Sequence, residues 1–354
     1  PPPPARPRRP PPPPPPRGRG VGLAAMRRID CHVHLVGDGS SGSGCWVRFR
    51  TLYHRFMGGV MLREHGMPRD LFRKGKVDEA YVERLVEMVE GSASLDAAVL
   101  LAQDIPYSDD GEPLPEKGGF HVPNDYLFEV VERHPDIFLA AASIHPGRPD
   151  AMEELERCIE RGAPVLKLLP NCLNVNCSDK RYQRFWERMA EAGMIFLSHT
   201  GGELSLPVMR PEYADPAILR LPLECGVRVI AAHCAGRSGL WDPDYTAGLL
   251  KMFEEFPNLY GDNSALSTPI RSGTVPKVLA GGQAVMERIL HGSDFPIPVG
   301  GFGPWRVGAI DRGTWRAASA EGNALERDCL LKRGMGFEEE TFGRLARLMG
   351  ERTS

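Results

Sequence analysis

Long apolar runs, closely spaced cysteine pairs and a large excess of one charge are all missing from this 354-residue sequence. No apolar run reaches the roughly 20 residues that cross a bilayer, and no stretch has the apolar core of a signal peptide, so we expect neither a membrane protein nor a secreted one. The eight cysteines include no Cys-x-x-Cys motif and are expected to be reduced thiols of a cytoplasmic protein. A net charge of −3 with mostly dispersed basic residues argues against a nucleic-acid partner.

Proline is concentrated in the first twenty residues, which are almost entirely proline, arginine and glycine. Because such a segment has no apolar side chains to bury, we predict a disordered tail at residues 1–25 and a folded domain at residues 26–354. A proline-rich run can also dock in the aromatic groove of a recognition domain, but a simple tail is the favoured interpretation. Met26, directly before the first predicted strand, would be a natural start of the working protein.

The rest of the chain alternates short apolar runs with segments of helical periodicity. We predict strands at residues 28–35, 97–102, 137–144, 164–169, 194–199, 227–233, 258–263 and 288–293. We predict helices at residues 79–90, 124–133, 150–161, 180–192, 215–224, 246–256 and 275–287, and a closing helical region at 321–350. Nearly continuous apolar runs are typical of parallel strands covered by helices. Eight such units are the number at which a parallel barrel closes, so we predict a (β/α)8 TIM barrel.

One connection, residues 36–78 after the first strand, is too long for an ordinary loop. It contains several large apolar side chains: Trp46, Phe49, Tyr53, Phe56, Met57, Met61 and Leu62. We therefore predict an insertion that packs as a lid or rim of the barrel.

The first strand contains the pattern His-x-His. At strand period, Asp30, His32 and His34 share one face. The other face is apolar and is predicted to pack toward the helices: Ile29, Cys31, Val33 and Leu35. Two neutral imidazoles on one rigid strand can hold a divalent cation, although such a pair also occurs at exposed strand ends.

Other polar side chains stand at the carboxyl ends of four further predicted strands, where parallel barrels carry their active sites. Lys167 is near the end of the fourth strand, and His199, His233 and Asp294 end the fifth, sixth and eighth. Counting back by twos predicts small or apolar residues in the barrel interior beneath them: Val165, Ile195, Leu197, Val229, Ala231, Leu290 and Gly292. His291, out of phase with Asp294, is predicted to point toward the helices, and His65 is expected on the surface. The convergence of these polar residues indicates a metal-dependent catalytic site.

These motifs resemble those of the amidohydrolase superfamily of metal-dependent barrels, most closely its amidohydrolase-2 branch. The resemblance runs from about Met26 to the carboxyl end and rests on five segments: Asp30-Cys31-His32-Val33-His34, Lys167-Leu168-Leu169-Pro170, Ser198-His199-Thr200-Gly201-Gly202, Ala232-His233-Cys234 and His291-Gly292-Ser293-Asp294-Phe295-Pro296. It implies that His32, His34 and Asp294 bind the metal, that His199 is a further ligand, and that His233 is a ligand or a proton carrier. Barrels of this family are often dimers or larger, so a homo-oligomer is expected.

Two roles are open for Lys167. In two-metal members of the superfamily, a carboxylated lysine at this position bridges both ions, and His199 and His233 would then hold the second ion. In the other interpretation, one metal is sufficient and Lys167 is an unmodified cation that faces the substrate. Burial and neighbouring positive charge would both depress its pKa. A mixed histidine and carboxylate ligand set suits zinc first and manganese next.

The resemblance implies hydrolysis by a metal-activated water. Asp294 would take the proton of that water, and His233 would stabilise the oxyanion or relay a proton. We therefore predict a hydrolase of a C–N or C–O bond in a small molecule, such as an amide, cyclic amide or lactone. The alternative is a carboxy-lyase of an aromatic or unsaturated acid, which the same branch includes. A binding or scaffold protein is disfavoured, because open metal sites of this kind usually serve chemistry.

Loops that follow the predicted strands are expected to select the substrate. Asn171 follows the fourth strand, Arg237 the sixth and Arg271 the seventh. Either arginine could grip a carboxylate in a bidentate manner, and either could equally form a salt bridge within its loop.

Overall fold

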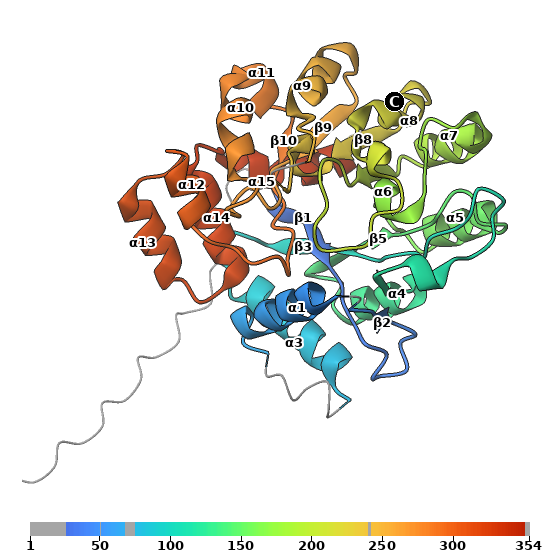
Figure 1. Ribbon diagram of the computed structural model, residues 1–354, viewed down its shortest axis with the longest axis horizontal. Helices are drawn as coiled ribbons and strands as arrows, with labels where there is room; N and C mark the ends of the chain where they lie inside the picture. The colour runs from blue at the N-terminus through green and yellow to red at the C-terminus, as the bar shows by residue number, and fades with distance from the viewer. Residues whose placement is uncertain (1–25, 50, 68–74, 240–241, 351–354) are drawn as a thin grey trace, which may run out of the picture.

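The computed structural model describes residues 26–49, 51–67, 75–239 and 242–350. The predicted tail at residues 1–25 lies outside them. In the described part of the chain, eight parallel strands form one sheet that helices surround (Figure 1). In sheet order the strands are β1 (Ile29–His34), β3 (Ala97–Leu101), β5 (Phe138–Ala142), β6 (Val165–Leu168), β7 (Ile195–Ser198), β8 (Arg228–Ala231), β9 (Leu259–Asp262) and β10 (Ile289–Leu290). Each strand lies within its predicted range, and the predicted (β/α)8 barrel is confirmed.

Backbone hydrogen bonds connect the segment after β10 to β1 and so close the barrel. The amide of His34 donates to the carbonyl of Phe295 at 2.8 Å, and the amide of Asp294 donates to the carbonyl of His32 at 2.9 Å. Asp294, four residues after the end of β10, is therefore fixed directly beside the His-x-His strand.

Helices cover the outside of the barrel because each turns an apolar stripe toward the strands. In α7, for example, Phe185, Trp186 and Met189 are buried. The covering helices are α3 (Val77–Glu90), α4 (Asn124–Arg133), α5 (Ala151–Glu160), α7 (Gln183–Glu191), α8 (Arg220–Glu224), α9 (Thr246–Glu255), α10 (Val275–Ala280) and α11 (Gly282–Met286). The single turn α6 (Pro170–Leu173) follows the carboxyl end of β6. After β10, three helices gather on one side of the barrel (Figure 1): α12 (Phe302–Arg306), α13 (Arg312–Ala320) and α14 (Ala324–Gly334). None of the helices in the described ranges is long and apolar enough to cross a membrane.

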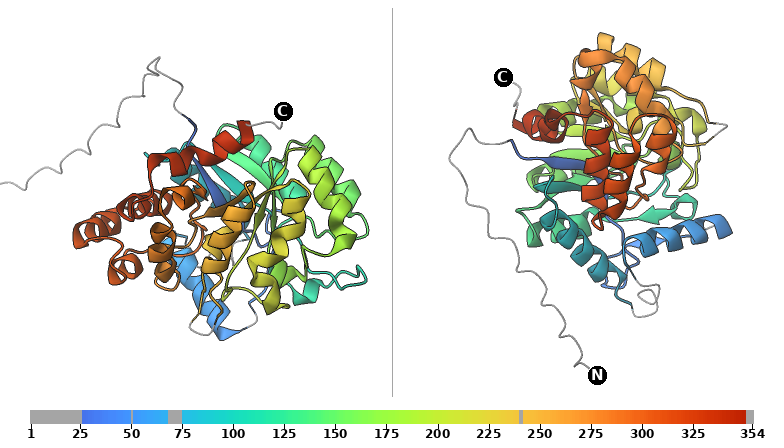
Figure 2. Two further views of the ribbon diagram at one scale, coloured as in Figure 1. Left: turned by 90° about the horizontal axis from the view of Figure 1, so that it is seen from above. Right: turned by 90° about the vertical axis from the view of Figure 1, so that its left-hand side faces the viewer.

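The insertion after β1 contains β2 (Trp46–Val47) and α1 (Leu52–Glu64). β2 pairs in antiparallel fashion with β4 (Phe120–His121), outside the barrel sheet. Figures 1 and 2 show α1, in blue, at the edge of the barrel. The insertion therefore forms part of the barrel rim, as predicted.

The large apolar side chains of the insertion have different surroundings. Phe49, Met61 and Leu62 line the cavity described below, whereas Phe56 is 66% exposed. The side chains of Tyr53 and Met57 lie outside the described part of the structure. His65, which follows α1, is buried rather than on the surface, because its Nε2 lies 2.9 Å from the carbonyl of Pro296 and its ring packs on Phe295.

An extra residue in β1 changes the direction of its first side chains. The pairing of β1 with β3 shifts between Asp30 and Val33, which is a β-bulge. Ile29 and Cys31 therefore pack inside the barrel, and the prediction that they face the helices is wrong.

Beyond the bulge, Val33 and Leu35 pack toward the helices as predicted, so His32 and His34 face the interior. The prediction that Asp30 shares their face is wrong, because Asp30 lies between two inward-facing residues. Its Oδ1 accepts hydrogen bonds from the amides of His32 and Ser293, both at 3.0 Å. Burial raises the pKa of Asp30 to about 7.

A left-handed turn after β8 produces a second change of direction. Ile230 and Ala232 pack in the interior, whereas Val229 and Ala231 face the helices, contrary to the prediction. His233 has a φ of 58°, a conformation that residues other than glycine seldom adopt. The turn, rather than strand alternation, directs His233. The interior positions predicted on other strands are confirmed for Val165, Ile195, Leu197 and Leu290.

The end of the barrel opposite the predicted site is closed by α15 (Glu339–Gly350). Leu345 and Leu348 of this helix pack with the interior side chains, among them Ile29 at the start of β1. The ring of His291 packs against Phe342 of the same helix at 4.5 Å between centroids, so it points toward the helices as predicted. The barrel interior is therefore a filled core that supports the strand ends from below.

Candidate active site

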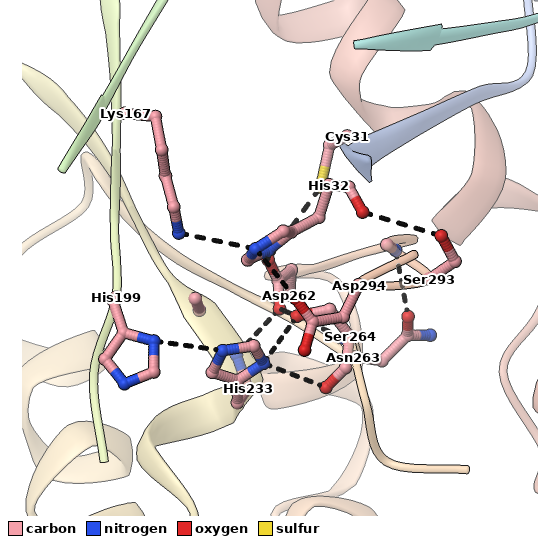
Figure 3. Close-up of polar contacts among 12 residues, drawn as sticks. Cys31, His32, Lys167, His199, His233, Asp262, Asn263, Ser264, Ser293 and Asp294 are labelled. Atoms are coloured by element: carbon pink, nitrogen blue, oxygen red, sulfur yellow. Dashed lines mark hydrogen bonds and ion pairs between the residues drawn. The ribbon is translucent and has the colours of Figure 1, made fainter. Parts of the chain in front are cut away.

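Six polar side chains predicted to form a site come from five strand ends of the barrel. They are His32 and His34 on β1, Lys167 on β6, His199 after β7, His233 after β8 and Asp294 after β10. Five of them are buried, and His34 is partly buried. Figure 3 shows most of this group, with the imidazoles of His32, His199 and His233 close to one another.

The carboxylate of Asp294 lies against both imidazoles of β1. Its Oδ1 is 3.2 Å from Nε2 of His32 and 3.3 Å from Nε2 of His34. Burial raises the pKa of Asp294, but the neighbouring imidazoles of His32 and His34 hold it below its ordinary value on balance. Asp294 is therefore a carboxylate at neutral pH.

Asp262, the last residue of β9, belongs to the site and was missed by the sequence reasoning. Its Oδ2 lies 2.8 Å from Nδ1 of His32, and its Oδ1 accepts the amides of His233 at 2.7 Å and Ser264 at 3.0 Å. Burial raises the pKa of Asp262, but His32 and the other donors lower it by more, so the group is ionised. Since a carboxylate can only accept, Nδ1 of His32 carries the proton and Nε2 presents a lone pair toward Asp294. One signal could have found Asp262, because it stands at the carboxyl end of the predicted seventh strand.

The same carboxylate orients His233 through a serine. Ser264 Oγ hydrogen-bonds to Oδ1 of Asp262 and lies 2.8 Å from Nδ1 of His233. Because Ser264 donates its proton to Asp262, it accepts one from Nδ1 of His233. Nε2 of His233 is left with a lone pair, and it faces Nδ1 of His199 at 3.3 Å (Figure 3).

His199 has its other ring nitrogen directed at the loop after β7. Nε2 of His199 is buried, makes no hydrogen bond with the described residues, and lies 3.7 Å from Oε2 of Glu203. Burial lowers the pKa of both His199 and His233 well below the ordinary value, so both rings are neutral at pH 7. Burial raises the pKa of Glu203.

Lys167 is fully buried, and its Nζ lies 3.3 Å from Nε2 of His32. Burial lowers its pKa to about 8, which increases the fraction of neutral amine at physiological pH. With a pKa of about 8, both forms of the amine are present near neutral pH. The neutral amine can be carboxylated, and the protonated amine is the cation of the other interpretation, so both predicted roles stay open.

A buried ion pair lies behind the strand ends that carry Asp262 and Asp294. Lys332 of α14 is 3.2 Å from Oδ2 of Asp328, and neither side chain is exposed to solvent. Nζ of Lys332 also donates to the carbonyls of Asn263 and, at 3.3 Å, Gly292. The lysine therefore joins the chain segments that follow β9 and β10.

The residues present fit a divalent metal. The ligand atoms of His32, His34 and Asp294 lie within 4.8 Å of one another. Nε2 of His32 and Oδ1 of Asp294 are both acceptors, and a cation near them would remove their mutual repulsion. A second group of similar spread contains Asp262 and His233, but the oxygens of Asp262 already accept hydrogen bonds. We therefore assign the first group as the candidate metal centre and Asp262 as the residue that orients it.

A cavity of about 330 Å³ opens above these strand ends. Its floor includes His34, His199, His233 and Asp294. Its walls come from the insertion after β1, from β4 and from the loops after β7, β9 and β10.

The three predicted substrate-binding residues have different positions. Arg271 is buried and lines the cavity, where its guanidinium donates to the carbonyls of Gly236 at 2.7 Å and Gly202 at 2.6 Å. Arg237 is exposed, and Asn171 is buried in α6. Neither of these two is among the described residues that line the cavity. The structure therefore brings only Arg271 to the site.

Comparison with protein families gives one match. Residues 29–326 match the family model described as amidohydrolase. No curated protein matches the chain.

Solved structures with the same fold cover most of the chain at low sequence identity. An uncharacterised TIM-barrel protein from Bordetella bronchiseptica is 16% identical, with a TM-score of 0.55, and the match covers 87% of this chain and 100% of that chain. A probable 2-pyrone-4,6-dicarboxylic acid hydrolase from Acinetobacter baumannii, with citric acid bound, is 15% identical, with a TM-score of 0.50 and coverage of 88% and 100%. A dihydroxybenzoic acid decarboxylase from Polaromonas, with bound manganese and the inhibitor 2-nitroresorcinol, is 12% identical, with a TM-score of 0.52 and coverage of 92% and 97%. At these identities the structures support the barrel fold.

Proposed function

The chain belongs to the amidohydrolase family, and from this premise we propose that it is a metal-dependent hydrolase of a C–N or C–O bond in a small molecule. An amide, a cyclic amide or a lactone is the proposed substrate. The observation that carries the proposal is the contact of Asp294 with both His32 and His34 at the floor of a cavity. Zinc is the first candidate metal and manganese the next, because the ligands are imidazole and carboxylate.

His32, His34 and Asp294 would hold the metal, with His199 and His233 as further nitrogen donors beside it. When bound, a divalent ion supplies Lewis acidity and makes a coordinated water acidic near neutral pH. The carboxylate of Asp294 is ionised and can accept a proton from a water at the floor of the cavity. Nε2 of His233 carries a lone pair because Ser264 and Asp262 fix the proton on Nδ1, so this nitrogen can also accept a proton. Arg271 is the predicted substrate-binding residue that lines the cavity.

The experiment that tests this proposal combines metal analysis with isotope labelling. Protein produced with added zinc and manganese should contain about one metal per chain, or two if Lys167 bridges them, and a panel of amides and lactones should yield acids that carry 18O from labelled water. Lys167→Ala should reduce a content near two to one or none if the lysine is a bridging ligand, and should leave a content near one unchanged if it faces the substrate. Protein without metal and without turnover would contradict the proposal.

A carboxy-lyase is the second candidate. It is supported by the shared fold of the manganese-containing decarboxylase described above. The same labelled water distinguishes the two reactions. A lyase would release carbon dioxide from an acid without incorporating 18O into the organic product.

A further inference from the structure

The floor and the walls of the cavity have different chemistry. Polar groups of the strand ends form the floor, whereas most of the walls are hydrocarbon. The apolar wall residues are Phe49, Met61, Leu62, Phe120, Leu204, Leu206 and Ile270. They come from four separate segments, so the apolar surface is assembled by the tertiary structure rather than by one sequence motif.

On the insertion side, Phe49 is held in place by a glycine of α1. A Cβ atom at Gly58 would lie 2.6 Å from Cε1 of Phe49, so the ring contacts the helix backbone where the glycine leaves it room. Met61 and Leu62 lie one turn further along the same helix and also line the cavity. The insertion therefore presents a continuous apolar surface.

The opposite side is built by a similar close approach. A Cβ atom at Gly119 would lie 2.8 Å from Cδ of Pro207 and 2.9 Å from Cδ2 of Leu206. The loop after β7 consequently packs directly on the backbone beside Phe120. Farther out, Leu204 and Ile270 line the cavity and are 38% and 51% exposed, so the apolar surface continues to the mouth.

The charged groups of the wall already bond to backbone groups of the protein. The carboxylate of Asp38 accepts the amide of Ser40 at 3.0 Å, and the guanidinium of Arg48 donates to the carbonyl of Pro115. Oε1 of Glu203 accepts the amides of Ser205 at 2.5 Å and Leu206 at 3.0 Å. The terminal nitrogens of Arg271 hold the carbonyls of Gly202 and Gly236. A ligand that fills the cavity above the floor therefore meets mainly hydrocarbon.

Given the proposed hydrolytic function, on which this step rests, we infer that the substrate is a small amphipathic molecule. Its reactive carbonyl lies at the floor, and an apolar body extends between Phe49 and Ile270 toward the mouth. A volume of about 330 Å³ is at the lower end of the range of small-molecule pockets, about 300–1,000 Å³. A cavity of this size is too small for a folded protein or a polysaccharide. Its hydrocarbon wall selects against sugars and other polyhydroxylated compounds.

Calorimetric binding of straight-chain carboxylates, which mimic the acids released by hydrolysis, tests the inference without requiring turnover. With the metal-loaded protein, affinity should increase about fourfold for each added methylene, from butyrate to octanoate. Phe49→Ala should weaken octanoate about fivefold or more and butyrate little. Phe56→Ala is the matched control, because this phenylalanine is on the same insertion, is 66% exposed and is not among the described cavity-lining residues.

Ile270→Asp provides a second variant at an exposed position of the mouth, where a charge is tolerated by the fold. It should weaken octanoate and leave butyrate unchanged. Equal affinity across the series, absence of binding, or equal effects of Phe49→Ala and Phe56→Ala would overturn the inference. A chain-length dependence without hydrolysis of any amide or lactone would refute the proposed function and leave the ligand class standing.

Discussion

The floor of the cavity and its wall differ in how their residues are held. On the floor, the single residue Asp262 hydrogen-bonds to each of His32, His233 and Ser264, and the buried Lys332 joins the adjoining segments. On the wall, Phe49 is 41% exposed and is held by packing on a helix at the edge of the barrel.

This difference separates two properties of the site. Polar atoms joined in a buried network keep a fixed geometry, which catalysis requires. Apolar side chains on loops tolerate exchange, because their contacts are not directional. Substitutions in the floor should therefore change the reaction or the stability, and substitutions in the wall should change which ligand binds.

The largest effect is expected for Asp294→Asn. The variant loses a negative ligand and a proton acceptor of the floor, so kcat should fall by about 10²–10⁴-fold and the metal content should fall with it. Kinetics and elemental analysis measure both. Asp110→Asn, on the exposed surface, is the control. Unchanged turnover in Asp294→Asn would contradict the proposed role of Asp294 as metal ligand and proton acceptor.

Asp328→Ala tests the buried ion pair with Lys332 that lies behind the floor. It leaves Lys332 buried without its carboxylate, which should lower the free energy of unfolding by about 3–5 kcal/mol in urea titrations. Asp125→Ala, which breaks an exposed pair with Arg157, should lower it by less than about 1 kcal/mol. Similar losses of unfolding free energy in the two variants would show that the buried pair contributes no more to stability than the exposed pair.

Acidification tests the junction between the two regions. His65 joins the insertion to the segment after Asp294, and burial lowers its pKa to about 4. The unfolded chain binds a proton near pH 6.5, so this contribution to stability is complete above pH 6.5 and is lost as the pH falls toward 4, up to about 3 kcal/mol. His65→Gln should reduce the slope of unfolding free energy against pH in this range. Identical slopes in the wild type and His65→Gln would show that His65 does not cause the loss of stability in acid.

Asp262→Asn should weaken metal binding about 10–100-fold, because Nδ1 of His32 loses the acceptor that keeps its proton there. Competition with a chelator measures this affinity. Ser264→Ala is the matched control, because Ser264 bonds to the other oxygen of the same carboxylate, Oδ1. This variant should lower kcat and leave the metal affinity unchanged. Equal losses of metal affinity in the two variants would mean that both hydrogen bonds of Asp262 support metal binding.

The smallest effect is expected in the wall. Gly58→Ala should displace the ring of Phe49 and weaken octanoate by a factor of about three, with no change for butyrate. Gly248→Ala in α9, where an added Cβ meets no neighbour within 4 Å, should leave both affinities unchanged.

Much of the barrel could be predicted from the sequence, because buried parallel strands consist of nearly continuous apolar runs. The same periodicity located Lys167, His199, His233 and Asp294, since the carboxyl ends of such strands meet on one face. The direction of single side chains could not be predicted. A bulge in β1 and the left-handed turn at His233 each change the phase, and neither leaves a mark in the alternation of residues.

Asp262 was missed for another reason. The residue belongs to no recognisable motif, and its role depends on His32 and Ser264, which only the folded barrel brings to its two oxygens. Arg237 and Asn171 show the opposite case. Their positions after strands agree with a role in binding, yet Asn171 is buried in α6, Arg237 is exposed, and neither is among the described residues that line the cavity.

The packing of α15 across the base of the barrel has a consequence for how the chain folds in the cell. α15, which fills the space beneath β1, is made about 300 residues after it. At roughly 5–20 residues per second, this interval is about 15–60 s. During that time the nascent barrel has unpaired strand edges and an open base, so its early strands depend on chaperones or on rapid pairing of neighbouring strands to avoid aggregation.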